Sequence, residues 1–202
     1  MGFLNNSDPW EQRNSPDLTL AQKQLKKRIA KGETEAIVEL FDQHGESLLK
    51  YLTARVGATN ARDVLQNIFT RLFRYHKKLA KANNLTAYIF ATARNEAIRF
   101  QQQPENRESA KAASLDSDNE LIDKSVSPAS TLENKESVQL LLSNLDDASR
   151  EIVQLKIFSG LTFKEVGEIA GLPEQTAATK YRRAIEKLKQ LADHTADHTV
   201  TN

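Results

Sequence analysis

Two blocks of helical periodicity, separated by a stretch without any, constrain what this chain can fold into. In residues 20–103 and 131–191, apolar side chains recur every three to four positions, which is typical of amphipathic helices. Residues 104–130 are rich in Ser, Asn, Asp and Glu and lack this period, so we expect a flexible acidic linker there. The sequence predicts an all-α protein of two small helical domains, with a flexible arm over residues 1–19 and a polar tail over 192–202.

Charge is distributed unevenly along the chain. The 202 residues carry 28 Lys and Arg against 27 Asp and Glu, so the net charge of +1 says nothing about partners. Residues 60–103, however, contain eight basic and two acidic side chains, whereas residues 104–137 contain four basic and eight acidic ones. A basic helical block is typical of a surface that meets an anionic partner, and also of an ordinary solvated face.

Several function classes are excluded or disfavoured. The absence of cysteine excludes a disulfide scaffold, a thiolate zinc site and a cysteine nucleophile. No glycine-rich phosphate loop or nucleophile elbow is present, so we expect no enzyme and no cofactor. His194 and His198 have metal-ligand spacing but lie in the tail without other ligands, so we expect no metal. The first residues lack the basic start and apolar run of a signal peptide, and no apolar run approaches the ~20 residues that span a membrane, so we expect no signal peptide and a cytoplasmic protein.

The sharpest local signal is the run TFKEVGEIAGLPEQT over residues 162–176. Thr162 and Glu165 have the spacing of a capping box, and Gly171 fits the left-handed end of a short helix. Gly167 has no side chain where we expect the next helix to pass closely. These features together predict a helix-turn-helix motif.

The second helix of this motif is expected to have an apolar inner face and a polar outer face. Residues 174–190 contain five basic and two acidic side chains. Small polar side chains near a helix N-terminus can enter the major groove of DNA, while basic neighbours meet phosphates. The predicted DNA contacts are Gln175, Thr176, Thr179, Lys180, Arg182 and Arg183. The alternative is an ordinary helical hairpin with a basic face.

Side chains that cap helices predict where other helices begin. Asn60 is expected to cap the helix that carries residues 64–79, with Asp63 in the first turn of that helix. Thr86 is expected to cap the last helix of the first block, and Asp146 or its neighbour Asp147 the first full helix before the helix-turn-helix.

In this order, the two blocks resemble those of an extracytoplasmic-function (ECF) sigma factor, a promoter-recognition subunit of bacterial RNA polymerase. The resemblance covers residues 20–103, as sigma region 2, and residues 131–191, as sigma region 4. It implies that the chain binds core RNA polymerase and promoter DNA, contacting the β′ clamp helices and the β flap. It also implies that region 4 reads the −35 element through the recognition helix described above.

Within region 2, the resemblance implies two functional helices. The segment ARDVLQNIFTRLF, residues 61–73, resembles the helix that docks on the β′ clamp helices. The implied polymerase contacts are Asn60, Arg62, Asp63, Gln66, Asn67 and Phe69. The segment YIFATARNEAI, residues 88–98, resembles the helix that opens DNA and captures flipped bases of the −10 element. The implied DNA contacts there are Tyr88, Arg94, Asn95 and Arg99.

The chain departs from the family pattern at the docking helix. Where the family usually has Asp-Ala-Glu-Asp, this chain has Asn60-Ala61-Arg62-Asp63, which removes acids that face a basic polymerase surface. A phosphate on Thr59 would add a charge of about −1.5 to −2 at a helix N-terminus, where negative charge is favoured. The chain resembles ECF members that lack the acidic run and are linked to Ser/Thr kinases. Our hypothesis is that phosphorylation of Thr59 restores polymerase binding, with Thr53 and Thr70 as competing sites.

Further departures keep other functions open. Arg99 stands where the family usually has Asp, residues 101–103 are Gln where an Arg pair is usual, and Ala178 replaces a common Lys. One alternative is a stand-alone helix-turn-helix regulator that uses only residues 131–191. Another is a sigma-like decoy that occupies polymerase without starting transcription. An anti-sigma factor is an alternative regulatory partner to a kinase.

Overall fold

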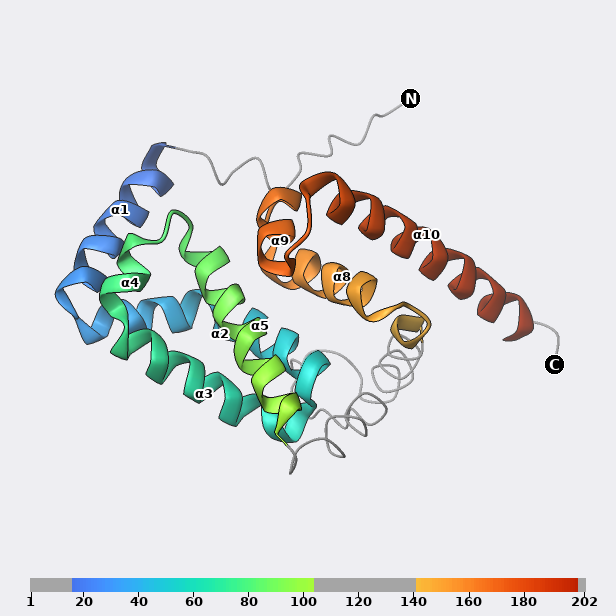
Figure 1. Ribbon diagram of the computed structural model, residues 1–202, viewed down its shortest axis with the longest axis horizontal. Coiled ribbons are helices and arrows are strands. Elements are labelled where there is room, and N and C mark those ends of the chain that lie inside the picture. Colours follow the sequence, from blue (N-terminus) through green and yellow to red (C-terminus); the bar gives the residue numbers. More distant parts are fainter. Residues whose placement is uncertain (1–15, 104–140, 200–202) are drawn as a thin grey trace.

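The computed structural model describes residues 16–103 and 141–199, and every regular element within these ranges is a helix, as predicted. The first block comprises α1 (Pro16–Lys31), α2 (Thr34–Val56), α3 (Ala58–Arg74), α4 (His76–Lys81) and α5 (Leu85–Gln102). The second block comprises α8 (Asp147–Ser159), α9 (Phe163–Ala170) and α10 (Glu174–Thr199) (Figure 1).

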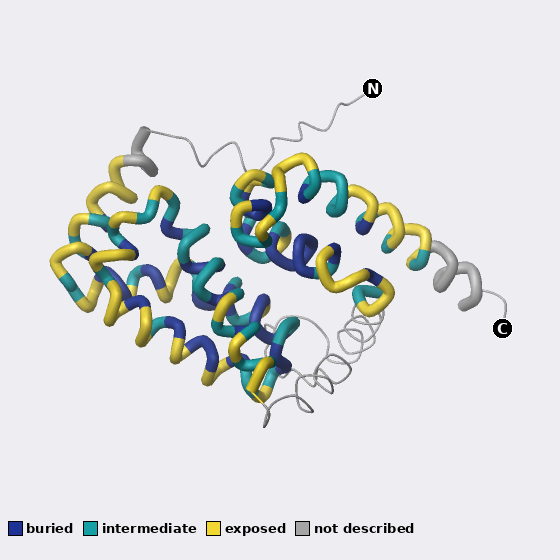
Figure 2. The backbone as a smooth tube through the Cα atoms, viewed as in Figure 1, coloured by how far each residue is buried: buried dark blue, intermediate teal, exposed yellow. Residues whose placement is uncertain are grey.

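The first block is built around the long pair α2 and α3. Gly57 joins the two helices with a φ of 82°, a left-handed value that suits glycine, so one residue suffices for the turn. Beyond it, the apolar stripes of the two helices face the same interior (Figure 2). Fully buried members include Leu48, Leu52, Ile68 and Leu72. The three-to-four spacing seen in the sequence therefore marks the buried face.

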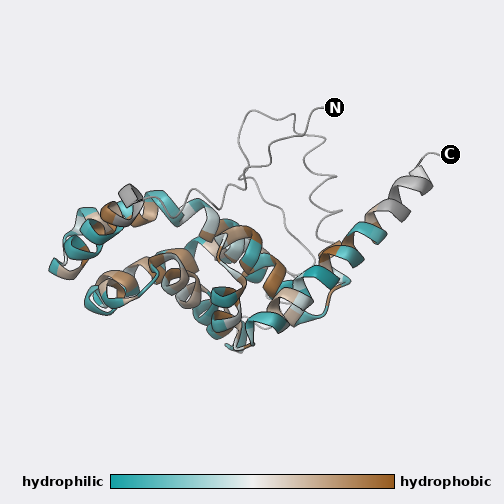
Figure 3. Cartoon of the chain, turned by 90° about the horizontal axis from the view of Figure 1, so that it is seen from above, coloured by the Kyte–Doolittle hydropathy of each residue, from teal (hydrophilic) through white to brown (hydrophobic). Residues whose placement is uncertain are grey.

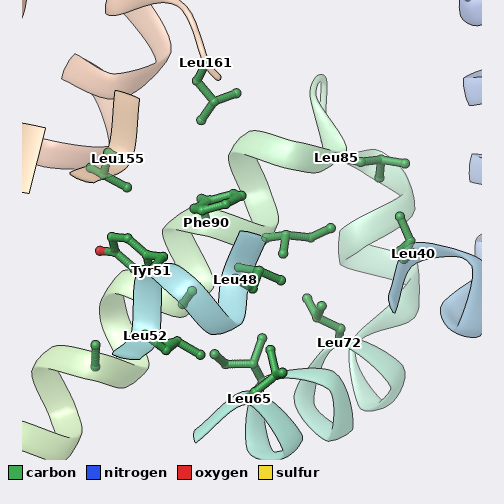
Figure 4. Close-up of a cluster of buried hydrophobic side chains, with 14 of the residues drawn as sticks. Leu40, Leu48, Tyr51, Leu52, Leu65, Leu72, Leu85, Phe90, Leu155 and Leu161 are labelled. Carbon is green, nitrogen blue, oxygen red and sulfur yellow. The ribbon is translucent and has the colours of Figure 1, made fainter. Parts of the chain in front are cut away.

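The two blocks pack against each other and share one core, a point that the sequence leaves open. Leu155 of α8 and Leu161, which follows α8, are buried in the same cluster as Tyr51 and Phe90 of the first block (Figure 4). The Tyr51 and Phe90 rings meet edge to face, with centroids 5.7 Å apart. The helices of the two predicted domains thus form a continuous apolar interior.

Two predicted helix caps are wrong. The structure begins α3 at Ala58, after Gly57, so Asn60 lies inside the first turn and its amide donates to the Val56 carbonyl (3.0 Å). Asn84, not Thr86, caps α5, because its Oδ1 accepts from the Ala87 backbone N–H at 3.2 Å. Helix α3 thus starts two residues before the predicted cap, and α5 starts one residue before it.

The predicted boundaries also shift. Helix α1 begins at Pro16, inside the expected arm, where proline at the first helical position costs no hydrogen bond. The helix that carries residues 64–79 is broken at Tyr75 into α3 and α4. Helix α10 continues to Thr199, past the predicted end at residue 191, and extends away from the rest of the molecule (Figure 3). The predicted linker lies outside the described residues.

Candidate nucleic-acid and polymerase interfaces

The helix-turn-helix has the local geometry that the sequence predicts. The Thr162 backbone N–H donates to Glu165 Oε2 (2.9 Å) and the Glu165 N–H donates to Thr162 Oγ1 (3.3 Å), which completes the capping box. Gly171 ends α9 with a φ of 72°. A Cβ on Gly167 would lie 2.6 Å from the Leu172 carbonyl oxygen, so only glycine fits under the turn. These contacts fix the angle between α9 and α10.

Helix α10 turns its predicted outer face away from the core. Ala177 and Ala184 are buried on the inner side. Gln175, Arg182 and Arg183 are exposed, whereas Thr176, Thr179 and Lys180 are half-buried. Lys180 Nζ lies 3.7 Å from Asp146 Oδ1 at the start of α8. The N-terminal half of α10 therefore presents a polar, basic strip that an anionic ligand can reach.

Helix α8 packs against the recognition helix α10. Asp146 caps α8, as one of the two predicted candidates, by accepting from the Ser149 N–H at 3.0 Å. A hydrogen bond from the Ser149 side chain, together with that backbone bond and the nearby Lys180 ammonium, lowers the pKa of the Asp146 carboxyl. Arg150 donates to the carbonyls of Leu142 and Leu145 and so ties the preceding turn to the helix. The first helical turns of the second block are thereby held together by charged hydrogen bonds.

The residues of α5 that are predicted to contact the −10 element lie on two different faces of the helix. Tyr88, Asn95 and Arg99 follow one another at intervals of seven and four, so they share a stripe, and Asn95 and Arg99 are exposed. Arg94 points instead toward α8. Its Nε and Nη2 donate to the two carboxylate oxygens of Glu151 at 2.9 and 3.1 Å. The structure thus groups three of the four predicted side chains and separates Arg94.

A groove of about 600 Å³ lies between α3 and α5 beside this stripe. Its walls carry basic and aromatic side chains, with a single carboxylate, Glu96, which is paired with Arg71. The Tyr75 ring, at the end of α3, has the Arg71 guanidinium 5.9 Å and the Lys78 ammonium 5.6 Å from its centroid. The lining residues are Val64, Asn67, Thr70, Arg71, Arg74, Tyr75, Glu96, Arg99, Phe100 and Gln103.

Asn67 and Arg99 in this groove are among the predicted site residues, whereas Arg71, Arg74 and Tyr75 are not. Their spacing contains the signal, because positions 71, 74 and 75 follow Asn67 by about one or two helical turns. Basic groups from two helices around an aromatic ring suit the phosphates and bases of an unpaired nucleic acid strand.

The predicted polymerase-binding residues occupy the outer face of α3, with two exceptions. Arg62, Asp63, Gln66 and Asn67 are exposed side by side. Asn60 is half-buried, and Phe69 is half-buried against Phe41, with the ring centroids 5.0 Å apart. The exposed Phe41, Phe73 and Val38 extend the apolar part of this surface. The first turn of α3 contains no acidic residue, because the helix begins at Ala58 and Asp63 therefore lies beyond the first turn in which it is expected.

Thr59 is exposed in the first turn of α3. The competing Thr53 is buried at 8% exposure, whereas Thr70 is exposed and its hydroxyl donates to the Gln66 carbonyl at 2.9 Å.

Among the described residues, no three His, Asp or Glu side chains gather to hold a metal ion. The side chains of His194 and His198 lie outside the described set. Within the described helices, none is both long and apolar enough to cross a membrane.

The fold and these surfaces define a helix-turn-helix protein with a second helical block. Residues 141–190 match the family described as Sigma-70, region 4. The chain is 26% identical over 158 residues to the RNA polymerase sigma factor SigZ of Bacillus subtilis, spanning 78% of this chain and 87% of that protein. It is 25% identical over 178 residues to the ECF RNA polymerase sigma factor SigW of the same organism, spanning 83% and 95%.

Among solved structures, the fold is similar to that of CnrH in complex with the cytosolic domain of CnrY. The TM-score is 0.65 and the sequence identity 22%, over 86% of this chain and 98% of the other. This likeness concerns the fold. The family model is of a sigma factor region, SigZ and SigW are both sigma factors, and SigW is an ECF RNA polymerase sigma factor.

Proposed function

We propose that the chain is an ECF sigma factor that binds core RNA polymerase in the cytoplasm and directs it to specific promoters. The observation that carries this proposal is the match of residues 141–190 to sigma region 4, because those residues form the helix-turn-helix with its exposed basic strip. The similarity to whole sigma factors extends the argument to the first block. The chain directs an enzyme by binding energy and supplies no chemistry of its own.

Transcription with purified components tests this function. The full chain is added to core RNA polymerase and fragmented genomic DNA of the source organism, and the transcript 5′ ends are sequenced. We expect new start sites that share two sequence elements with a fixed spacing. If the start sites are the same with and without the chain, the proposal is wrong. A stand-alone regulator would instead bind a palindromic DNA site without polymerase.

The exposed strip of α10 is proposed to read the −35 element. Two observations support this proposal: Arg182 and Arg183 are exposed, and exposed arginines are common phosphate contacts of DNA-binding proteins. Replacing either with Ala should weaken the promoter complex at all sequences and reduce the salt dependence of binding by about one unit per lost contact. Lys189→Ala is the matched control, because Lys189 is exposed on the same helix outside the predicted strip. Equal salt dependence in all variants would remove α10 from the DNA interface.

The outer face of α3 is proposed to dock on the polymerase β′ clamp helices. It combines the exposed Asp63 and Gln66 with the neighbouring aromatic Phe69 and Phe73, a mixture that suits a protein partner. Gln66→Arg should lower the affinity for core polymerase, because it adds positive charge where the family's partner surface is basic. The Arg182→Ala variant should bind polymerase normally.

We also propose that phosphorylation of Thr59 strengthens this docking. The supporting observations are the exposure of Thr59 and the absence of acids in the first turn of α3, where a helix dipole favours negative charge. The affinity for core polymerase should rise in Thr59→Glu and not in Thr59→Ala. Thr70→Glu is the control, because Thr70 is exposed further along the same helix. Equal affinities, together with equal promoter activity of Thr59→Ala in cells, would reject the switch.

A protein inhibitor is the other regulatory partner that we consider. The similar fold of CnrH was determined in complex with the cytosolic domain of CnrY. Affinity purification of this chain from its source organism would recover a corresponding anti-sigma partner. Release of that partner would free the chain to bind core polymerase.

A further inference from the structure

The junction between the two blocks contains a nearly buried cluster of three charges. Glu151 of α8, with a side chain 11% exposed, accepts both hydrogen bonds from Arg94 of α5. Its Oε1 also lies 3.4 Å from Nη2 of Arg55, whose side chain is 15% exposed. One carboxylate of the second block therefore pairs with two guanidinium groups of the first.

Polar contacts surround this cluster along the junction. Gln154 of α8 lies with its Nε2 at 3.5 Å from the Ala54 carbonyl oxygen of α2. The Asn84 side-chain amide donates to Glu165 Oε1 at 2.6 Å and so joins the start of α5 to α9. Apolar contact is supplied by Leu155 and Leu161 against Tyr51 and Phe90 (Figure 4). The junction is a mixed polar and apolar interface.

Other groups oppose closure of the same junction. Within the described residues, the buried Tyr51 hydroxyl, Arg55 Nε and Gln154 Oε1 have no hydrogen-bond partner. Each such group loses its hydration when the blocks close, which is unfavourable. Their cost disappears when the blocks separate, because water can then reach them. Closure of the junction therefore combines favourable ion pairs and apolar contacts with the cost of these unsatisfied groups.

We propose that Glu151 is an internal latch that closes the two blocks and withholds Arg94 from nucleic acid. The carboxylate occupies the Nε–Nη2 edge of Arg94, which would otherwise be able to bind a phosphate in the same bidentate way. Arg94 therefore becomes available to promoter DNA when α8 leaves α5. This inference rests on the proposed sigma function and on the contact of Arg94 with the −10 element that the family resemblance implies.

The latch is tested first by the distance between the blocks. The chain has no cysteine, so two introduced cysteines, Lys77→Cys on α4 and Glu168→Cys on α9, take a fluorescent donor and acceptor specifically. Removing one partner of a buried ion pair leaves uncompensated charge. Glu151→Gln should therefore raise the ratio of open to closed molecules at least tenfold by single-molecule energy transfer. Asp147→Asn is the control, because it makes the same charge change on α8 at a side chain that is 96% exposed.

The consequence for nucleic acid is measured on the same proteins. The probe is a fluorescent 20-nucleotide single strand of mixed sequence. We expect Glu151→Gln to bind it at least tenfold more tightly than wild type, and the gain to vanish when Arg94→Gln is added. A second variant pair, Ala54→Cys with Gln154→Cys joined by a short cleavable cross-linker, should bind weakly until the linker is cut. Circular dichroism confirms that each variant keeps its helix content.

The outcomes separate the latch from the proposed function. If Glu151→Gln leaves the distance distribution unchanged, there is no latch. If the blocks open but binding does not rise, or rises without Arg94, the latch does not withhold Arg94 and the inference is overturned. Transcription by the wild-type chain with core polymerase reports the sigma function independently, since that assay does not depend on which residue holds the blocks together.

Discussion

At the scale of single residues, Gly167 sets the geometry of the recognition motif. An added Cβ would lie 2.6 Å from the Leu172 carbonyl oxygen and 3.4 Å from the Glu174 nitrogen, both backbone atoms of the turn. Because backbone cannot move aside as a flexible side chain does, we expect Gly167→Ala to destabilise the protein by about 1–3 kcal/mol. The loss should appear as a lower denaturant midpoint and as weaker promoter binding.

Gly171 provides the comparison for that change. It has a φ of 72°, and a Cβ there would meet nothing within 4 Å. Asn tolerates the left-handed conformation, so Gly171→Asn should cost less than Gly167→Ala. If the two variants lose equal stability, close approach of the turn is not what requires glycine at position 167.

Tyr51 is a residue whose burial makes the fold sensitive to alkaline pH. Burial raises its pKa to about 12, against the opposing influence of Arg55 and Arg94 and with the added effect of Glu151. A raised pKa stabilises the fold fully below the ordinary value near 10, and this stability is lost as the pH rises from there through about 12. Tyr51→Phe should remove this component and leave the protein at least as stable at pH 7, because no hydroxyl is then buried without a partner.

The measurement is unfolding by denaturant at several pH values between 8 and 12, with wild type and Tyr51→Phe compared at each. Lysine titration affects both proteins equally, so the difference between them isolates Tyr51. A difference that stays constant across this range would contradict the assignment.

At the scale of helices, the cap of α8 is a second site of pH dependence, at the acidic end. The pKa of Asp146 is lowered, so its contribution is present at neutral pH and is lost as the pH falls below its ordinary value near 3.8. Asp146→Ala should cost about 1 kcal/mol at pH 7. Asp146→Asn keeps the capping oxygen without the charge, so its stability should depend less on pH below 4. Melting curves at pH 3 and pH 7 distinguish the three proteins, and parallel pH profiles would exclude Asp146 as the titrating group.

Helix starts also show where local sequence predicts structure and where it does not. The Thr162–Glu165 capping box is predicted correctly, because both of its hydrogen bonds join residues three apart. The start of α3 is missed, because Gly57, at a φ of 82°, turns the chain tightly enough for the helix to begin at Ala58 without a side-chain cap. Apolar periodicity likewise continues through Tyr75 although the backbone breaks there. Tertiary packing determines where these helices begin and break.

At the scale of the whole molecule, the shared core is the feature that the sequence does not predict. Glu151 lies on a helix with ordinary amphipathic spacing, and its two arginine partners are 57 and 96 positions away. The fold class and the recognition helix follow from local pattern and could be predicted. The separation of Arg94 from Asn95 and Arg99 depends on how two distant blocks meet, so no local pattern contains it.

A shared core makes the stability of the two blocks interdependent. Leu155 of α8 is fully buried in the cluster that includes α2 and α5. Leu155→Ala should therefore destabilise the protein by about 2–5 kcal/mol and should speed hydrogen exchange in α2 and α5 as well as in α8. Ile157→Ala is the control, because Ile157 is 54% exposed on the same helix. If exchange instead rises only in α8, α9 and α10, the two blocks unfold independently and the junction contributes little to the stability of the first block.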